Sequence, residues 1–217
     1  MTPAGLVELL ADLIVGLADG LTDGPGARRP LGHPARVAID GAPAADPAGL
    51  AAALVDPLRV RGHPVVRVPA AGFVRPASVR LERGRTDPDA LYELALDTGA
   101  LLREVLVPLG PGGSGRFLAS LWDAGRDRAT RAPYLSAGPA TVVLIDGALL
   151  LRPQLRAHLD LAVHLHLSPA ALARRTPAGQ RWALEAHARY EQEAAPLDAD
   201  VIVRMDDPRR PAVVVRP

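Results

Sequence analysis

Two short apolar stretches that end in the same three letters constrain the fold of this chain most strongly. RVAIDG (Arg36–Gly41) and TVVLIDG (Thr141–Gly147) are nearly continuous runs of apolar residues, each followed by Asp and Gly. Runs of this kind predict strands buried on both faces, as in parallel sheets covered by helices. Ligands of such sheets bind beyond the carboxyl ends of the strands. We therefore expect Asp40 and Asp146 on the ligand side of an α/β domain.

The rest of the chain alternates strand-like and helix-like segments. The other expected strands are His63–Ala70, Leu161–Leu167 and Asp200–Met205, and Pro211–Arg216 is expected to be a sixth strand or an ordered tail. The polar, Arg-rich stretch Gly72–Asp87 predicts a loop, and the Gly-rich stretch Gly110–Arg116 predicts a turn. The expected helices are Ala48–Arg61, Asp87–Leu109 (as one or two helices), Leu149–Leu159, a helix capped by Ser168-Pro169, and Ala178–Ala194.

The N-terminal stretch Gly5–Leu21 predicts an amphipathic helix that docks on the domain, because its apolar residues recur at helical spacing. It carries three acidic residues and no basic segment before them, so it does not resemble a targeting signal. Gly and Pro are frequent in Thr22–Pro34, which predicts a loop. We expect residues 1–34 to form this helix and a linker, and residues 35–217 to form the α/β domain.

Composition excludes several kinds of chemistry. The net charge of +1 over 217 residues gives no basic surface for nucleic acid or membrane, so we expect neither as a partner. The chain contains no cysteine, which removes disulfides and thiolate chemistry and suits a cytoplasmic protein. It also contains no lysine, because all 25 basic residues are Arg. No lysine is therefore available as a phosphate clamp, a Schiff-base amine or a general base.

The stretch GAPAADPA (Gly41–Ala48) has the length of the phosphate-binding loop G-x-x-x-x-G-K-[ST] and lies between an expected strand and an expected helix. Its last three positions differ, because Asp46 replaces Gly, Pro47 replaces Lys, and Ala48 replaces Ser or Thr. These changes remove the phosphate-binding cation, a backbone N–H and the magnesium-binding hydroxyl.

Asp followed by Pro is instead a strong signal for the start of a helix. The Asp46 carboxylate is expected to accept the helix N–H groups that would otherwise hold phosphate. Taken alone, the stretch is equally consistent with an ordinary strand–turn–helix.

Five segments in the same order resemble the uridine kinase-like nucleoside kinases, a branch of the P-loop NTPases, from about Arg36 to Asp207. The resemblance implies a three-layer P-loop NTPase-type fold with a five-stranded, mainly parallel sheet flanked by helices. It also implies ATP and Mg²⁺ as cofactors and phosphoryl transfer to a nucleoside such as uridine or cytidine. The segments are RVAIDGAPAADPAGLA, RGHPVVRVPAAGFVRPASVRLERG, LVPLGPGGSGRFLASLWD, VVLIDGALLLRPQLRAHLDLAVHL and RYEQEAAPLDADVIV.

The same resemblance assigns residues to the site. The nucleotide loop corresponds to Gly41, Ala45, Asp46, Pro47 and Ala48, and the position of the family's catalytic base is Ala71. Asp146 corresponds to a magnesium ligand. The substrate pocket corresponds to Phe73, Arg75, Arg116 and Phe117, and the phosphate-binding lid corresponds to Arg174, Arg175 and Arg181.

Because the phosphate loop and the base position are altered, the sequence predicts a degenerate member with weak or no kinase activity, a pseudokinase. One alternative is a non-catalytic module that binds a nucleoside, another small metabolite or a protein partner. The other is an active small-molecule kinase with a rearranged site that uses Arg in place of Lys.

Two histidines lie outside this assignment. His164 and His166 are two residues apart on an expected strand, so their side chains point to the same face, a spacing that can bind a metal ion. No third ligand is evident in the sequence. They are therefore expected to be histidines at an edge or on the surface.

Overall fold

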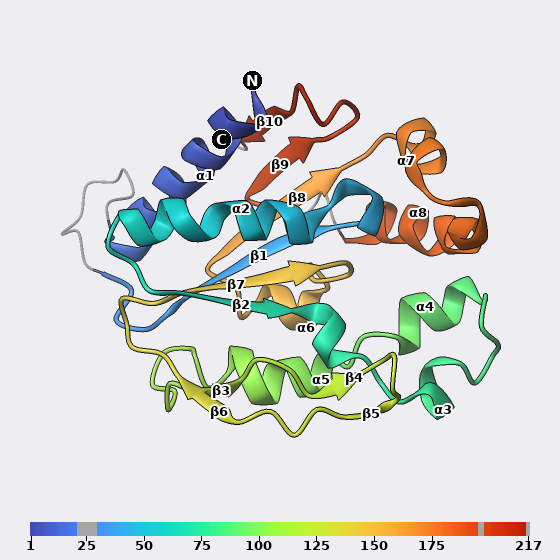
Figure 1. Ribbon diagram of the computed structural model, residues 1–217, viewed down its shortest axis with the longest axis horizontal. Helices are drawn as coiled ribbons and strands as arrows, with labels where there is room; N and C mark the ends of the chain where they lie inside the picture. The colour runs from blue at the N-terminus through green and yellow to red at the C-terminus, as the bar shows by residue number, and fades with distance from the viewer. Residues whose placement is uncertain (21–29, 195–197, 216–217) are drawn as a thin grey trace.

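The computed structural model describes residues 1–20, 30–194 and 198–215 of the chain. Its centre is a six-stranded sheet in the order β10-β9-β8-β1-β7-β2 (Figure 1). Five strands run parallel, and β10 pairs antiparallel with β9 at one edge. The strands are β1 (Ala35–Gly41), β2 (Val65–Pro69), β7 (Val142–Gly147), β8 (Leu161–His166), β9 (Val201–Arg204) and β10 (Ala212–Val215).

The predicted α/β class and mainly parallel sheet are confirmed, but the prediction of five strands was wrong. The C-terminal segment forms backbone hydrogen bonds along β9 and becomes the sixth strand. β1 and β7 are neighbours in register, so that Ile39 pairs with Asp146 and Asp40 pairs with Gly147. Because side chains alternate along a strand, Asp40 and Asp146 project from opposite faces of the sheet.

Helices α1 (Pro3–Ala18) and α2 (Pro47–Val60) cover one face of the sheet. Thr2 caps α1 by accepting the N–H of Gly5, and Leu10 and Ile14 of α1 pack with Leu54 of α2 in a shared core. The expected amphipathic helix is therefore present and belongs to the main core. Most of the expected loop Thr22–Pro34 lies outside the described residues.

Short elements between β2 and β7 cover part of the opposite face (Figure 1). The expected loop at residues 72–87 includes a turn of helix, and the expected helix Asp87–Leu109 is divided because Asp87 and Asp97 each cap a separate helix. The elements are η2 (Ala70–Phe73), α3 (Ala77–Arg80), α4 (Pro88–Leu94), α5 (Thr98–Leu101), η3 (Leu102–Leu106), β3 (Arg116–Leu118), β4 (Trp122–Asp123), β5 (Arg128–Ala129) and β6 (Tyr134–Ser136).

The segments after β7 pack on both faces, because Ala171 and Leu172 belong to the core under α1 and α2, whereas Leu155 and Tyr190 belong to the opposite core. The expected helix Leu149–Leu159 is reduced to α6 (Pro153–Arg156), whereas Ser168 caps α7 (Pro169–Arg175) as predicted. The expected helix Ala178–Ala194 begins as 3₁₀-helix η4 (Ala178–Ala183) and continues as α8 (Leu184–Glu193). Within the described ranges, no helix is both long and apolar enough to cross a membrane.

Candidate functional site

A cleft of about 440 Å³ opens at the carboxyl ends of β1, β2 and β7, next to the start of α2. Its floor and walls are largely apolar, formed by Pro, Ala, Leu and Val side chains from the loop after β1, from η2 and from α4. Three charged residues line it, namely Asp46, Arg67 and Asp146. The cleft therefore lies where a parallel sheet is expected to bind ligands.

The loop after β1 follows the path expected of a phosphate loop, because the strand passes through η1 (Pro43–Ala45) into α2. Gly41 lies close against β8, and an added Cβ would be 2.9 Å from the Cβ of Leu165. Asp46 has a left-handed backbone with φ 61° and ψ 55°. Asp and Asn tolerate this conformation better than most residues, and glycine adopts it freely. The backbone at Asp46 thus has a conformation that a glycine would also adopt.

Asp46 also caps α2, as the sequence predicted. Its Oδ1 accepts the N–H of Gly49 at 2.9 Å, and Pro47, the first helical residue, has no N–H. The N–H groups at a helix start are what a bound phosphate normally uses. In this chain, one is engaged by a carboxylate and another is missing. The negative charge that favours this helix end belongs to the protein itself.

An ion pair joins β2 and β7 beside this loop. Arg67 of β2 donates from Nε and Nη2 to Oδ1 of Asp146 at 3.1 and 2.9 Å, and its Nη2 also donates to the carbonyl of Ala48 at 3.1 Å. Asp146 is 4% exposed, and this burial raises the pKa of its carboxyl above the usual value. Arg67 opposes that rise, whereas the nearby Asp46 adds to it.

These residues do not fit a magnesium–triphosphate group. Arg67 engages one oxygen of Asp146, the only acidic side chain at the end of β7, and Ala48 offers no hydroxyl as a second magnesium ligand. Among the described residues that line the cleft, Arg67 is the one cation, and two carboxylates accompany it. A group with several negative charges would meet more negative than positive charge in this cleft.

The structure brings together only part of the predicted site. Gly41, Asp46, Pro47, Ala48, Ala71 and Asp146 line the cleft, and Ala45 is buried beneath the loop. The remaining predicted residues are not among its lining residues. Phe73 and Phe117 are fully buried in the core on the other face of the sheet.

The predicted pocket and lid arginines lie elsewhere. Arg116 is exposed on β3, with its guanidinium 5.3 Å from the ring centre of Tyr134. The backbone N–H of Arg75 bonds to Ala95, which ties its segment to the end of α4. Arg174 and Arg181 are exposed, whereas Arg175 donates to the carbonyl of Met205 at 2.8 Å.

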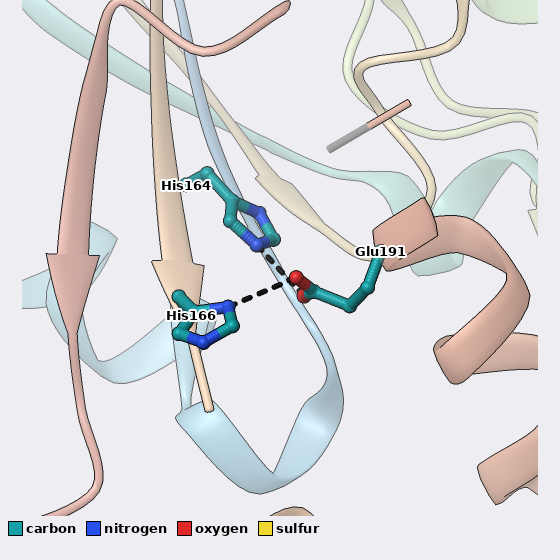
Figure 2. A group of neighbouring side chains, drawn as sticks. All are labelled: His164, His166 and Glu191. Atoms are coloured by element: carbon teal, nitrogen blue, oxygen red, sulfur yellow. Dashed lines mark hydrogen bonds and ion pairs between the residues drawn. The ribbon is translucent and has the colours of Figure 1, made fainter. Parts of the chain in front are cut away.

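Sequence reasoning missed Arg67 and the surroundings of the two histidines. An Arg within the apolar strand VVRVP was a signal for Arg67, because a buried strand carries a charge only where it finds a partner. His164 is fully buried in β8, near the middle of the sheet, so its expected place at an edge or on the surface was wrong. The partner of both histidines is Glu191 of α8 (Figure 2).

This histidine–glutamate cluster, consisting of His164, His166 and Glu191, is strongly charged. Burial alone would lower the pKa of His164, but hydrogen bonds with Asp40 and Glu191 raise it to about 9. Burial would likewise raise the pKa of Glu191, whereas His164 and His166 lower it to about 2. Both shifts favour an imidazolium–carboxylate ion pair at neutral pH.

No protein-family model and no curated protein matches the sequence. Among solved structures, a possible uridine kinase from Bacillus stearothermophilus matches with a TM-score of 0.62 and 17% identity, covering 90% of this chain and 96% of that one. A candidate fructose transport system kinase from Silicibacter sp. TM1040 matches with a TM-score of 0.57 and 26% identity over 88% of this chain and 89% of that one. D-glycerate 3-kinase from Cryptococcus neoformans var. grubii matches with a TM-score of 0.61 and 14% identity over 97% and 99%. The chain therefore shares the fold of these kinases.

Proposed function

We propose that this protein is a kinase-fold protein with weak or no phosphoryl-transfer activity, whose cleft binds a small metabolite that carries no triphosphate. The observation that supports this most strongly is the Asp46 carboxylate, which accepts the N–H of Gly49 at the start of α2. A nucleoside triphosphate would have to displace this carboxylate and then lie beside it. The Asp46 carboxylate already accepts a helix N–H group and supplies the negative charge that a helix start favours. A phosphate group would therefore gain little binding energy there.

The position of the catalytic base supports the same proposal. By resemblance that position is Ala71, which lines the cleft and has only a methyl group. A side-chain base contributes roughly 10²- to 10⁴-fold in rate. Phosphoryl transfer depends on a phosphate cradle, a cation, magnesium and an oriented nucleophile. Few of these four requirements are met by the described residues that line the cleft. Turnover is therefore expected to be weak or absent.

The lining of the cleft indicates which ligands suit it. A volume of about 440 Å³ is in the range of small-molecule sites, and most lining side chains are apolar. The carboxylates of Asp46 and Asp146 favour a neutral or cationic ligand with hydrogen-bond donors. A nucleoside meets this description without a phosphate group. Because one similar structure is described as a possible uridine kinase, uridine is the first ligand to test.

Thermal unfolding in the presence of uridine, cytidine, Mg-ATP and Mg-GTP, combined with an assay of ADP formation, tests the proposal. A ligand at about 100 times its Kd stabilises the folded state by ~2.7 kcal/mol, which is readily measured. We expect stabilisation by a nucleoside or a similar metabolite, and neither stabilisation nor ADP formation with Mg-ATP. Stabilisation by Mg-ATP with turnover would contradict the proposal. The absence of any shift would favour a protein partner for the cleft.

A second candidate, a kinase that uses Arg in place of Lys, rests on the position of Arg67. Its guanidinium lies 2.9 Å from Asp146 and 3.1 Å from the carbonyl of Ala48, beside the position where a phosphate-loop lysine would begin. If ADP formation is observed, Arg67→Gln should abolish it, whereas Arg116→Gln, at an exposed position of β3, should not. Equal activity in both variants would exclude this role for Arg67.

A further inference from the structure

The histidine–glutamate cluster lies apart from the cleft, on the face of the sheet that α8 covers. His164 and His166 project from β8 toward α8, and Glu191 reaches back between them (Figure 2). Nε2 of His164 is 2.8 Å from Oε1 of Glu191, and Nδ1 of His166 is 2.9 Å from Oε2. One ligand atom from each of the three residues lies within 4.8 Å of the others.

The ring of His164 is held in one orientation by groups behind it. Its Nδ1 lies 2.7 Å from Oδ2 of the fully buried Asp40, and Oδ1 of Asp40 accepts the N–H of Leu150 at 2.9 Å. A metal-binding histidine commonly donates its second ring N–H to a carboxylate in this way. Asp40 therefore occupies Nδ1 and directs Nε2 toward Glu191. The strand register, which pairs Asp40 with His164, fixes this arrangement.

From this arrangement we propose that His164, His166 and Glu191 form a binding site for a divalent transition-metal ion of the Zn²⁺ type. Two imidazole nitrogens and one carboxylate oxygen are a ligand set that Zn²⁺ uses where a fourth position stays open. The ion takes the place of the proton between Nε2 of His164 and Glu191, and this proton is released to solvent. Metal–ligand bonds of about 2.0–2.2 Å place neighbouring ligand atoms roughly 3.3 Å apart in a tetrahedron. The observed contacts of 2.8 and 2.9 Å go to different oxygens of Glu191, so the carboxylate has to turn until one oxygen lies at this spacing from both rings.

The fourth coordination position faces a cavity. A cavity of about 330 Å³ is lined by His166 and Glu191 together with mostly apolar side chains of α7 and α8. The side chains of His166 and Glu191 are 31% and 23% exposed, whereas that of His164 is not exposed. An ion can therefore enter from the cavity, and a water molecule or a small ligand can occupy the fourth position. Imidazole and carboxylate ligands without sulfur select Zn²⁺, Co²⁺ or Ni²⁺ over Cu⁺.

Equilibrium titration of the untagged, EDTA-treated full-length chain with Co²⁺, followed by displacement with Zn²⁺, tests the site. We expect one Co²⁺ per chain, the visible absorption of a tetrahedral Co²⁺ complex, loss of that absorption on adding Zn²⁺, and a higher Tm with Zn²⁺. The metal itself is the probe, so the result is independent of whether the cleft binds a nucleoside or Mg-ATP. Failure to bind Co²⁺ or Zn²⁺ stoichiometrically would overturn the proposal.

Matched variants separate this site from adventitious binding at other histidines. His166→Ala and Glu191→Gln should weaken Co²⁺ binding by more than the roughly 10- to 100-fold that loss of an outer partner costs. Asp40→Asn changes the residue that contacts Nδ1 of His164, and it should weaken Co²⁺ binding by an amount within that range. His158→Ala and Glu185→Gln, an exposed position on the same helix as Glu191, should bind as the unmodified chain does.

Far-UV circular dichroism checks that each variant folds. If folded His166→Ala and Glu191→Gln bind Co²⁺ as tightly as the controls do, the ion lies elsewhere and the proposed site is wrong.

Discussion

At the scale of single residues, the start of α2 depends on one side chain. Asp46 adopts a left-handed backbone and accepts the N–H of Gly49, and Pro47 follows it as the first helical residue. A Cβ added at Gly49 would overlap the Asp46 carboxylate in its capping position, so a side chain there would displace the cap. Asp46, Pro47 and Gly49 therefore together form a capped helix start.

Substitutions at Asp46 should separate the effect of its capping hydrogen bond on stability from the effect of its left-handed backbone. Asp46→Ala loses the cap, which costs about 1 kcal/mol, and forces alanine into a left-handed conformation, which costs about 1–2 kcal/mol more. Asp46→Gly loses the same hydrogen bond, but glycine adopts the conformation freely, so its loss of stability should be smaller. Urea unfolding measures both, with the exposed Asp56→Ala on the same helix as a control. Equal stability of the Ala and Gly variants would contradict this interpretation.

The tyrosines give a test that depends on pH. Burial raises the pKa of Tyr92 and Tyr190, and Glu193 and Asp40 respectively add to the rise, while a hydrogen bond to Glu104 raises that of Tyr134. All three tyrosines of the chain should therefore be less than half ionised at pH 10, where an unfolded tyrosine is half ionised. Their contribution to stability is fully present below pH 10 and is lost as pH rises above it. Tyrosinate absorbance measures this, and half-ionisation at pH 10 in the folded protein would contradict it.

Single residues differ in how far the sequence could predict their roles. The cap at Asp46 was predictable because its partner is three residues away. Arg67 and Asp146 are 79 residues apart, and His164 and Glu191 are 27 apart, so these contacts depend on how strands and helices pack. The same-side spacing of His164 and His166 was readable from the sequence. Their third partner was not, because α8 had to be placed over β8 first.

At the scale of elements, polar contacts join β1 to β8 near both ends of their pairing. At the amino end, Arg36 donates from Nε and Nη2 to the two oxygens of Asp160 at 2.9 and 2.8 Å, and its backbone N–H donates to the same carboxylate at 2.8 Å. Near the carboxyl end, Asp40 contacts His164. These contacts fit the observed register between β1 and β8, which the apolar runs of the sequence alone do not determine.

Removing one partner of the amino-terminal pair should be costly. The side chains of Arg36 and Asp160 are only 7% and 12% exposed, so Asp160→Ala leaves a buried guanidinium without its carboxylate. Loss of one partner of a buried pair typically costs about 3–5 kcal/mol. Asp56→Ala breaks an exposed pair with Arg59 and should change stability by less than about 1 kcal/mol. Urea unfolding of both variants measures the difference, and similar values would show that the Arg36–Asp160 pair does not hold the strands.

The parallel strands were predictable because long apolar runs need burial on both faces, and only the edge strand β10 was left open. Short elements were harder to predict from the sequence. The antiparallel pairs β3–β6 and β4–β5 have only two or three residues per strand and are mostly exposed, so no periodic pattern marks them. α4 ends at Leu94 and Asp97 caps the start of α5, a break that a continuous apolar pattern concealed.

At the scale of the whole molecule, a sheet of the kinase fold holds a cleft lined by two carboxylates and one guanidinium. The strand order places the ends of β1, β2 and β7 around this cleft, and the same order brings β8 under α8 at the histidine–glutamate cluster. The fold was predictable from ordered landmarks along the chain. The chemistry of the cleft was only partly predictable, because Arg67 changes the charge around Asp146.

Calorimetric titration of Mg-ATP into the unmodified chain, and into a variant with a rebuilt loop, tests most directly whether the cleft excludes nucleoside triphosphates. The variant combines Asp46→Gly, Pro47→Lys and Ala48→Thr, which restores the backbone N–H, the cation and the hydroxyl. We predict no measurable binding of Mg-ATP to the unmodified chain and a gain of binding in the rebuilt one. Stoichiometric binding of Mg-ATP to the unmodified chain, with Asp46 in place, would contradict the proposed function.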